Sequence, residues 1–337
     1  MSAAPPRLVL ALTACLLACP GDAPEEPTWQ RVHQGLPAAL LSVWGTAADD
    51  VWAVGADTRD GQGPLVLHFD GAAWTRVVTG EAQGNLWWVF GFDGGPIYMG
   101  GEGGMILRNQ GGAFTRMTTP GAATVFGIWG AAPDDVWAVG GASDSTGGFA
   151  WRLQGDAWVD EPTLPADIPT GAAGWKIFGA GPSDAWLVGS NGVALHWDGA
   201  ALTPGDTGVG SSLFTVHAAG GRYVAVGGLA TGIIVEDEGA GWKNVTPDPA
   251  PSGLSGVTVT AAGGGVAVGS FGAVLTRDPA AGWAEADLGF TIGQNLHGSW
   301  IDDQGGLWAV GGQTFSPPYD DGVLLHRGTS MIPGGDL

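Results

Sequence analysis

A short apolar run that ends in glycine recurs seven times along the chain. Five of the runs have an aliphatic or aromatic residue, a small residue and another aliphatic residue before the glycine, and the other two have Tyr98 or Leu187 at the middle position. The seven glycines are Gly55, Gly100, Gly140, Gly189, Gly227, Gly269 and Gly311. Successive glycines are 45, 40, 49, 38, 42 and 42 residues apart. Repeats of this length are typical of β-propellers, in which each repeat folds into one four-stranded blade. The pattern therefore predicts an all-β, seven-bladed β-propeller with antiparallel blades.

The first repeat indicates how a blade is built. Apolar runs at 40–45, 51–55, 65–69 and 74–77 predict four strands, which we call A, B, C and D from the axis outward. Strand B is apolar at nearly every position, as expected for a strand buried on both faces, whereas strand D alternates like a half-exposed outer strand. Asp70-Gly71, between strands C and D, is a dipeptide favoured in tight antiparallel turns.

The seventh repeat stops after its strand C. No Trp-x-x-Val segment follows Arg327-Gly328, but Trp29-Gln30-Arg31-Val32 precedes the first repeat. We therefore expect the first strand to complete the last blade, which removes the exposed sheet edges of an open array. The predicted propeller spans 29–328, after a Pro- and acid-rich tether at 20–28 and before a C-terminal tail at 329–337.

Residues 1–19 have the features of an export signal. The apolar run Leu8–Ala18 is too short to span a bilayer, and it ends in Leu16-Leu17-Ala18-Cys19. This tetrapeptide resembles the lipobox of bacterial lipoproteins, and the resemblance implies acylation of Cys19. Cys15 in Leu12-Thr13-Ala14-Cys15 is an alternative, as is an ordinary secretory signal. Gly21, rather than Asp, implies by the same resemblance an outer-membrane location, facing the periplasm or the exterior.

Composition limits the classes of partner. The chain has 33 acidic and 12 basic residues and a formal net charge of −21, which opposes binding to nucleic acid or anionic lipid. Membrane association is therefore expected through the lipid anchor alone. Solubility alone explains the charge, and a preference for cationic partners is the alternative. Both cysteines lie in the signal, so the mature domain is expected to lack disulfides and thiolate metal sites.

Residues that recur once per repeat are most simply structural. Aromatic columns on strands A, B and D predict packing between blades. A polar column on strand C consists of His68, Arg108, Arg152, His196, Glu236, Thr276 and His326. Equivalent positions on neighbouring sheets lie roughly 10 Å apart, too far to share one metal, so hydrogen bonding is predicted here. The acidic pairs that begin at Asp49, Asp134 and Asp302 are read as turn residues, and no metal or cofactor is expected.

The repeats resemble the tryptophan-rich repeats of bacterial propeller lipoproteins. The resemblance rests on Trp44-Gly45, the run 50–55, Asp70-Gly71 and Trp74, and it covers about residues 29–328. The repeats are more distantly similar to sialidase-type Asp-box propellers and to photosystem II assembly-factor propellers. The segment 237–242 matches only the second half of an Asp-box. The resemblance implies the fold and no activity.

A sialidase would need a cluster of arginines at the propeller axis and a tyrosine nucleophile. Arg31, Arg76 and Arg116 are predicted on outer strands instead. We therefore expect a non-enzymatic, monomeric binding or scaffold propeller with a protein or carbohydrate partner. A lectin-like or glycan-active propeller, such as a glycoside hydrolase, is the alternative.

The candidate site is the face formed by the loops between strands D and A and between strands B and C. Residues just before the strand-A aromatic column either plug the channel or meet a ligand: Leu41, Trp87, Phe126, Trp175, Phe214 and His297. Of these, Trp87 and Trp175 are expected at the surface together with Lys176. The last B–C loop adds Phe315, Tyr319 and Asp320. Aromatic residues mixed with carboxylates suit recognition of carbohydrate or of a protein segment.

Overall fold

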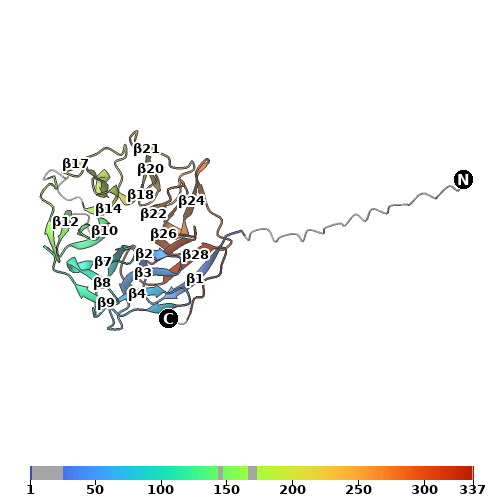
Figure 1. Ribbon diagram of the computed structural model, residues 1–337, viewed down its shortest axis with the longest axis horizontal. Helices are drawn as coiled ribbons and strands as arrows, with labels where there is room; N and C mark the ends of the chain where they lie inside the picture. Colours follow the sequence, from blue (N-terminus) through green and yellow to red (C-terminus); the bar gives the residue numbers. More distant parts are fainter. Residues whose placement is uncertain (2–25, 143–146, 166–172, 336) are drawn as a thin grey trace.

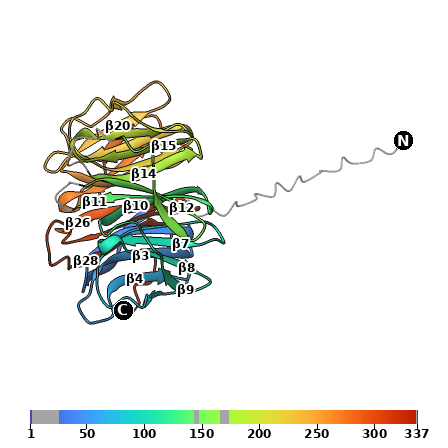
Figure 2. The same cartoon turned by 90° about the vertical axis from the view of Figure 1, so that its left-hand side faces the viewer.

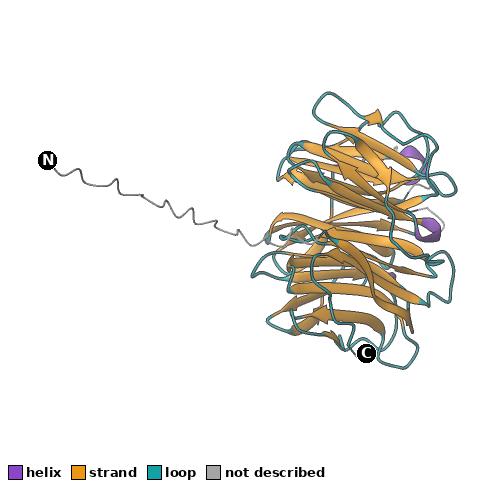
Figure 3. Ribbon diagram, turned by 90° about the vertical axis from the view of Figure 1, so that its right-hand side faces the viewer, coloured by secondary structure: helices purple, strands orange, loops and turns teal. Residues whose placement is uncertain are grey.

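The computed structural model describes residues 1, 26–142, 147–165, 173–335 and 337. These residues form seven four-stranded antiparallel sheets around one axis, which confirms the predicted seven-bladed propeller (Figure 1). Side views show the blades as layers of strands joined by loops at both ends (Figure 2). The helices of the described residues are single 3-10 turns that lie on one side of the disc (Figure 3): η1 (Glu102–Gly104), η2 (Ser190–Gly192) and η3 (Ser270–Gly272).

The four strand positions of a blade occur in the predicted order. The A strands, which pack against one another around the axis, are β2 (Leu40–Ala47), β6 (Leu86–Gly91), β10 (Thr124–Ala132), β14 (Gly174–Gly181), β18 (Leu213–Ala219), β22 (Leu254–Val259) and β26 (Asn295–Ile301). The B strands are β3 (Asp50–Asp57), β7 (Ile97–Gly101), β11 (Asp135–Gly141), β15 (Asp184–Gly189), β19 (Arg222–Gly227), β23 (Gly265–Gly269) and β27 (Leu307–Gly312).

The two outer positions complete each blade. The C strands are β4 (Pro64–Phe69), β8 (Ile106–Gln110), β12 (Phe149–Gln154), β16 (Ala194–Trp197), β20 (Ile233–Asp237), β24 (Val274–Asp278) and β28 (Gly322–Gly328). The D strands are β5 (Trp74–Arg76), β9 (Ala113–Arg116), β13 (Ala157–Asp160), β17 (Leu202–Pro204), β21 (Lys243–Asn244), β25 (Gly282–Glu285) and, for the last blade, β1 (Thr28–Leu36).

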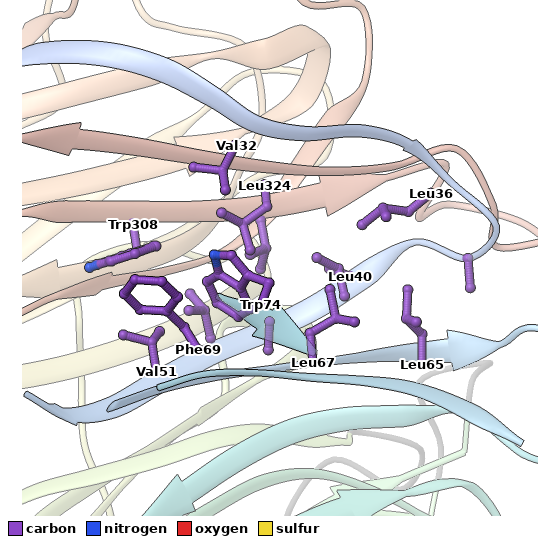
Figure 4. Packing of buried hydrophobic residues seen from close by; sticks show 14 of the residues in the cluster. Val32, Leu36, Leu40, Val51, Leu65, Leu67, Phe69, Trp74, Trp308 and Leu324 are labelled. Atoms are coloured by element: carbon purple, nitrogen blue, oxygen red, sulfur yellow. The ribbon is translucent and has the colours of Figure 1, made fainter. Parts of the chain in front are cut away.

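Strand β1 closes the ring, as the interrupted seventh repeat predicts. It pairs with β28, so that Trp29 lies opposite Arg327 and Arg31 opposite Leu325. The strand runs to Leu36, beyond the predicted end at Val32, and contains two register shifts. Its buried side chains join a cluster that links blades 7 and 1 (Figure 4): Val32 and Leu36 with Trp74, Trp308 and Leu324.

The repeat glycines are explained by a close backbone contact. A Cβ atom on Gly55 would lie 2.0 Å from the carbonyl oxygen of Ala39, which precedes strand A of the same blade. The same contact recurs in the other blades, but in blade 2 it belongs to Gly101 rather than to Gly100. Gly101 pairs with Leu86, the first residue of β6, so the predicted repeat position is one residue early there.

Members of the polar column on strand C form hydrogen bonds, some within their own blade and others, such as those of Arg108 and Glu236, to the next blade. His68 Nε2 lies 2.7 Å from Asp50 Oδ1, and the imidazole stacks on Trp52 with ring centroids 4.1 Å apart. His196 repeats this arrangement with Asp184 at 2.8 Å. In blade 3, the Arg152 guanidinium binds Asp135. These contacts agree with the structural role predicted for the column.

Candidate functional site

Every A strand contains a β-bulge near its start, and the bulges build the site. Near the start of each strand the pairing register skips one residue, and these seven residues form what we call the bulge ring: Leu41, Trp87, Phe126, Trp175, Phe214, Ser255 and His297. A bulge leaves its extra residue outside the ladder and redirects the side chain. Because the seven A strands surround the axis, the bulges bring seven side chains together at one end of it.

Aromatic contacts run through most of the bulge ring. The ring centroids of Phe214 and Trp175 are 6.1 Å apart, and those of Trp175 and Phe126 are 4.8 Å apart. Trp87 continues the series, 5.4 Å from Phe126 and 5.6 Å from His297. Aromatic pairs at these separations stabilise one another. The side chains of five blades therefore form one connected aromatic wall.

This wall bounds a cavity of about 210 Å³, which we call the axial cavity. Its lining comprises Trp87, Phe126, Trp175, Lys176, Phe214, Leu229, Ser255, His297, Thr314, Phe315 and Tyr319. Tyr319 comes from the B–C loop of blade 7, and its ring lies 5.5 Å from that of Trp87. Since Leu229 and Phe315 are loop residues exposed to solvent, the cavity opens on the face of the B–C loops.

The structure places most of the predicted site residues in this cavity. Trp87, Trp175 and His297 are wall residues, Tyr319 covers part of the wall, and Phe315 stands at the rim. Asp320 does not line the cavity. Its carbonyl oxygen accepts a hydrogen bond of 2.8 Å from the Gln313 amide and so closes the B–C loop of blade 7.

The expectation that Lys176 is a surface residue is wrong. Its side chain is only 4% exposed, and it extends from β14 toward blades 3 and 2. The ammonium donates a hydrogen bond to the Phe126 carbonyl oxygen and lies 4.2 Å from the ring centre of Trp88. Burial lowers the pKa of Lys176 to about 7. The residue follows the bulged Trp175, and the bulge directs it inward.

His297 is held neutral beside this lysine. Its Nδ1–H donates to the Leu41 carbonyl oxygen at 2.6 Å, which leaves Nε2 with a lone pair. Burial, and then the positive charge of Lys176, lower the pKa of His297 to about 4. Tyr319 stays protonated at neutral pH, because burial and the nearby Glu102 raise the pKa of its hydroxyl. Lys176 is therefore the one cation among the described residues that line the cavity.

Three consecutive B–C loops expose large apolar side chains beside the cavity. Leu229, Phe271 and Phe315, from blades 5, 6 and 7, are 70%, 76% and 55% exposed, and we call them the apolar arc. Phe271 has a φ of 55°, a left-handed conformation that is unfavourable for a bulky residue. The same turn holds Gly103 in blade 2 and Asn191 in blade 4.

Leu229 and Phe271 were not among the residues predicted from the sequence. Alignment of Ser270-Phe271-Gly272 with Ser190-Asn191-Gly192 would have revealed the unusual phenylalanine. Its phenyl ring adjoins a second depression, of about 460 Å³, shared with Phe290 and Ile292. The arc and the cavity therefore make one face of the disc both concave and apolar.

Other predicted features are located as follows. Arg31, Arg76 and Arg116 lie on the D strands β1, β5 and β9, as expected. Within the described ranges, no three His, Cys, Asp or Glu side chains are grouped as metal ligands. The same ranges contain no helix that is long and apolar enough to cross a membrane. Cys15 and Cys19 fall outside the described residues.

No family model and no curated protein matches this sequence. Among solved structures, the chain is similar to the WD40 propeller domain of Doa1, with a TM-score of 0.66, 14% identity and coverage of 88% of this chain and 96% of that one. It is similar to YCF48 bound to D1 peptide, with a TM-score of 0.64, 14% identity and coverage of 88% and 96%. It also resembles the GH74 xyloglucanase from Xanthomonas campestris, with a TM-score of 0.59, 15% identity and coverage of 88% and 55%. At these identities the likeness establishes a WD40-like propeller fold.

Proposed function

We propose that this chain is a non-enzymatic binding propeller that recognises a segment of a partner protein on the face formed by its B–C and D–A loops. The observation that carries the proposal is the axial cavity, whose aromatic walls come from the bulges of separate blades. Concave, mostly apolar sites with a few polar groups are the usual form of ligand sites. The exposed apolar arc extends the same surface outward, where a longer ligand would continue.

Charge on this face indicates the chemistry of the segment. Its loops carry the exposed carboxylates Asp206, Asp248, Asp287 and Asp321, and the whole chain has a net charge of −21. Such a field attracts cationic partners and accelerates their association. A segment that combines apolar side chains with Lys or Arg therefore fits the face best. The YCF48 propeller, solved with a bound D1 peptide, supports a peptide as the class of ligand.

Carbohydrate is the alternative ligand. Trp87 and Trp175 offer indole rings in the cavity wall, and the xyloglucanase shares the propeller fold. A lectin-like role would use the same cavity with little need for the apolar arc. Binding that depends on Trp175 but not on Phe315 would therefore favour a sugar over a peptide.

Selection of displayed random peptides on the full chain, in parallel with a glycan array, tests the proposal. We expect the selected peptides to be rich in apolar and basic residues, and Phe315→Ala to weaken their binding at least tenfold, as a hot-spot residue would. Met331→Ala, which removes an exposed apolar side chain from the C-terminal tail, is the control and should have no effect. Peptides that bind all three proteins equally would contradict this site.

We propose further that the propeller is monomeric and is held at the bacterial outer membrane by acylation of Cys19. Support comes from the lipobox-like Leu16-Leu17-Ala18-Cys19 and from Gly21. Two or more acyl chains make attachment stable, whereas one chain alone is marginal. Metabolic labelling with an alkynyl fatty acid should mark the wild type and the Cys15→Ser variant but not Cys19→Ser. Label lost only from Cys15→Ser would move the site to the earlier cysteine.

A further inference from the structure

The axial cavity contains a buried cation with no carboxylate to balance it. Lys176 is one of two lysines in the chain, and no acidic side chain of the described residues forms an ion pair with it. Its ammonium has three N–H donors, yet its only hydrogen bond within the described residues is to the Phe126 carbonyl oxygen. The Trp88 ring gives it a further, weaker contact.

A lysine in this position is costly if its role is packing alone. A buried ammonium loses its hydration, and this cost is offset by a partner of opposite charge or reduced when the amine gives up its proton. A methionine or leucine would fill the same space without that cost. The other titratable groups near the cavity are His297, Tyr319 and, beyond Tyr319, Glu102. The carboxylate of Glu102 accepts a hydrogen bond from Asn85, so it is engaged elsewhere.

We propose that the axial cavity binds a carboxylate carried on an apolar group, with the carboxylate on the Lys176 ammonium and the apolar group between the Trp87, Phe126 and Trp175 rings. This inference rests on the proposed function, because it names the chemistry that the cavity recognises. A volume of about 210 Å³ suits a group with one ring or one branched side chain. The carboxylate belongs either to a small free acid or to the C-terminal residue of a partner protein.

Binding of a carboxylate to Lys176 should depend on pH. In the empty cavity the pKa of Lys176 is about 7, and a carboxylate pairs only with the protonated amine. Affinity for the acid should therefore fall above pH 7, with a slope that approaches tenfold for each pH unit and a proton uptake on binding that approaches one. His297, with a pKa of about 4, stays neutral over this range and contributes nothing to the slope.

Calorimetric titration of the full chain with matched acids and amides tests the inference. One pair is 3-phenylpropionate and 3-phenylpropionamide, and the other is N-acetyl-Gly-Gly-Phe with a free or an amidated C-terminus, in which the acetylated N-terminus does not titrate. At pH 6 we expect the acid to bind at least tenfold more tightly than its amide. At pH 8 the acid should bind about tenfold more weakly than at pH 6, as a group with a pKa near 7 requires, whereas the amide should be unaffected. If only the phenylpropionate pair shows this difference between acid and amide, the carboxylate belongs to a small free acid. If only the peptide pair shows it, the carboxylate belongs to the C-terminal residue of a partner protein.

Lys176→Met should remove the preference for acid over amide and its pH dependence while the amide still binds. Lys243→Met is the matched control, since Lys243 is exposed on the outer strand β21, and it should behave as the wild type. Equal affinities of acid and amide in the wild type would overturn the carboxylate inference and leave the cavity as a binding site. Absence of binding by both members of both pairs would overturn this inference and count against the cavity itself. If Lys176→Met does not fold, the wild-type pH dependence decides.

Discussion

At the scale of single residues, the glycine at the end of each B strand is required by contact rather than by conformation. Gly189 has φ −159°, an extended geometry that any residue adopts. A Cβ atom there would nevertheless lie 2.2 Å from the Ala173 carbonyl oxygen. That oxygen accepts a hydrogen bond from the Ser190 amide, so it is not free to move away. The recurrence of glycine in the sequence therefore reports how closely strands A and B approach.

We predict that Gly189→Ala lowers the free energy of unfolding by more than about 2 kcal/mol, because backbone must shift to relieve the overlap. Gly181→Ala is the control in the same blade, since a Cβ there meets nothing within 4 Å. It should change stability by less than about 0.5 kcal/mol. Urea unfolding of both variants measures the difference. Equal losses of stability in the two variants would show that the close contact is not the reason why glycine is required at position 189.

At the scale of strands, polar clamps join neighbouring blades. Glu236 on β20 is buried and accepts hydrogen bonds from Arg277 Nε at 2.8 Å and Trp283 Nε1 at 2.6 Å, both in blade 6. Arg277 Nη2 adds a third at 3.0 Å, and Arg222 of the same blade as Glu236 adds a fourth at 2.7 Å. Burial alone would raise the pKa of Glu236, but the hydrogen bonds from Arg277 and Trp283 and the charge of Arg277 outweigh it, so the pKa is lowered.

We predict that Glu236→Ala lowers the free energy of unfolding by about 3 kcal/mol at pH 7, because the buried Arg277 guanidinium loses its ion-pair partner and keeps, within the described residues, only its hydrogen bond to the Gly263 carbonyl oxygen. The folded-state pKa of Glu236 is below the unfolded value of 4.5, so its contribution is complete above that pH. This contribution to stability is lost as the pH falls through the folded-state pKa. The difference in free energy of unfolding between the wild type and Glu236→Ala should therefore become smaller in acid. Glu238→Ala, which removes an exposed carboxylate that contacts Arg222, is the control. A difference in free energy of unfolding that stays constant from pH 7 to pH 3 would show that ionised Glu236 does not supply this stability.

At the scale of the whole molecule, ring closure depends on the junction of the two chain ends. Strand β1 supplies the D position of blade 7 and covers the edge of β28. Its buried Val32 belongs to the cluster in which the rings of Trp74 and Trp308 lie 5.8 Å apart, one from blade 1 and one from blade 7 (Figure 4). The junction therefore protects a sheet edge and joins the first and last blades.

We predict that Val32→Asp lowers the free energy of unfolding by at least about 3 kcal/mol, because it buries an unpaired carboxylate in this cluster. Gln34→Asp places the same carboxylate at an exposed position of β1 and should have little effect. Thermal unfolding compares the variants, and hydrogen exchange of the β28 amides should accelerate only in Val32→Asp. Unchanged exchange in β28 would mean that β1 does not hold the last blade.

The positions of the cavity residues could be predicted from the sequence better than the directions of their side chains. Trp87, Trp175 and His297 were predicted because each lies three residues before an aromatic residue of the strand-A column, and this spacing does not depend on the direction of the side chain. Lys176 was misplaced for a specific reason. The bulge at Trp175 interrupts the two-residue alternation of the strand, so the face on which the next side chain lies no longer follows from its position.

The exposure of the apolar arc could not be predicted from the sequence either. Leu229 and Phe271 stand in short loops whose sequences do not reveal whether a neighbouring blade covers them. Burial there is a property of how the blades and loops pack, and only the coordinates show that both side chains face solvent. Gly101 in place of Gly100 has a related cause, because two adjacent glycines fit the pattern and the pairing of β6 with β7 selects one.

The amino-acid sequence by itself determined the number of blades, the order of strands within them and the strand that closes the ring. These follow from local periodicity, turn residues and a missing segment, which are all properties of the chain in one dimension. The tertiary structure alone decided that seven bulges meet at one end of the axis, that Lys176 is buried there and that three apolar loops lie beside it. Those features depend on distances between blades that are far apart in sequence, and packing in three dimensions sets such distances.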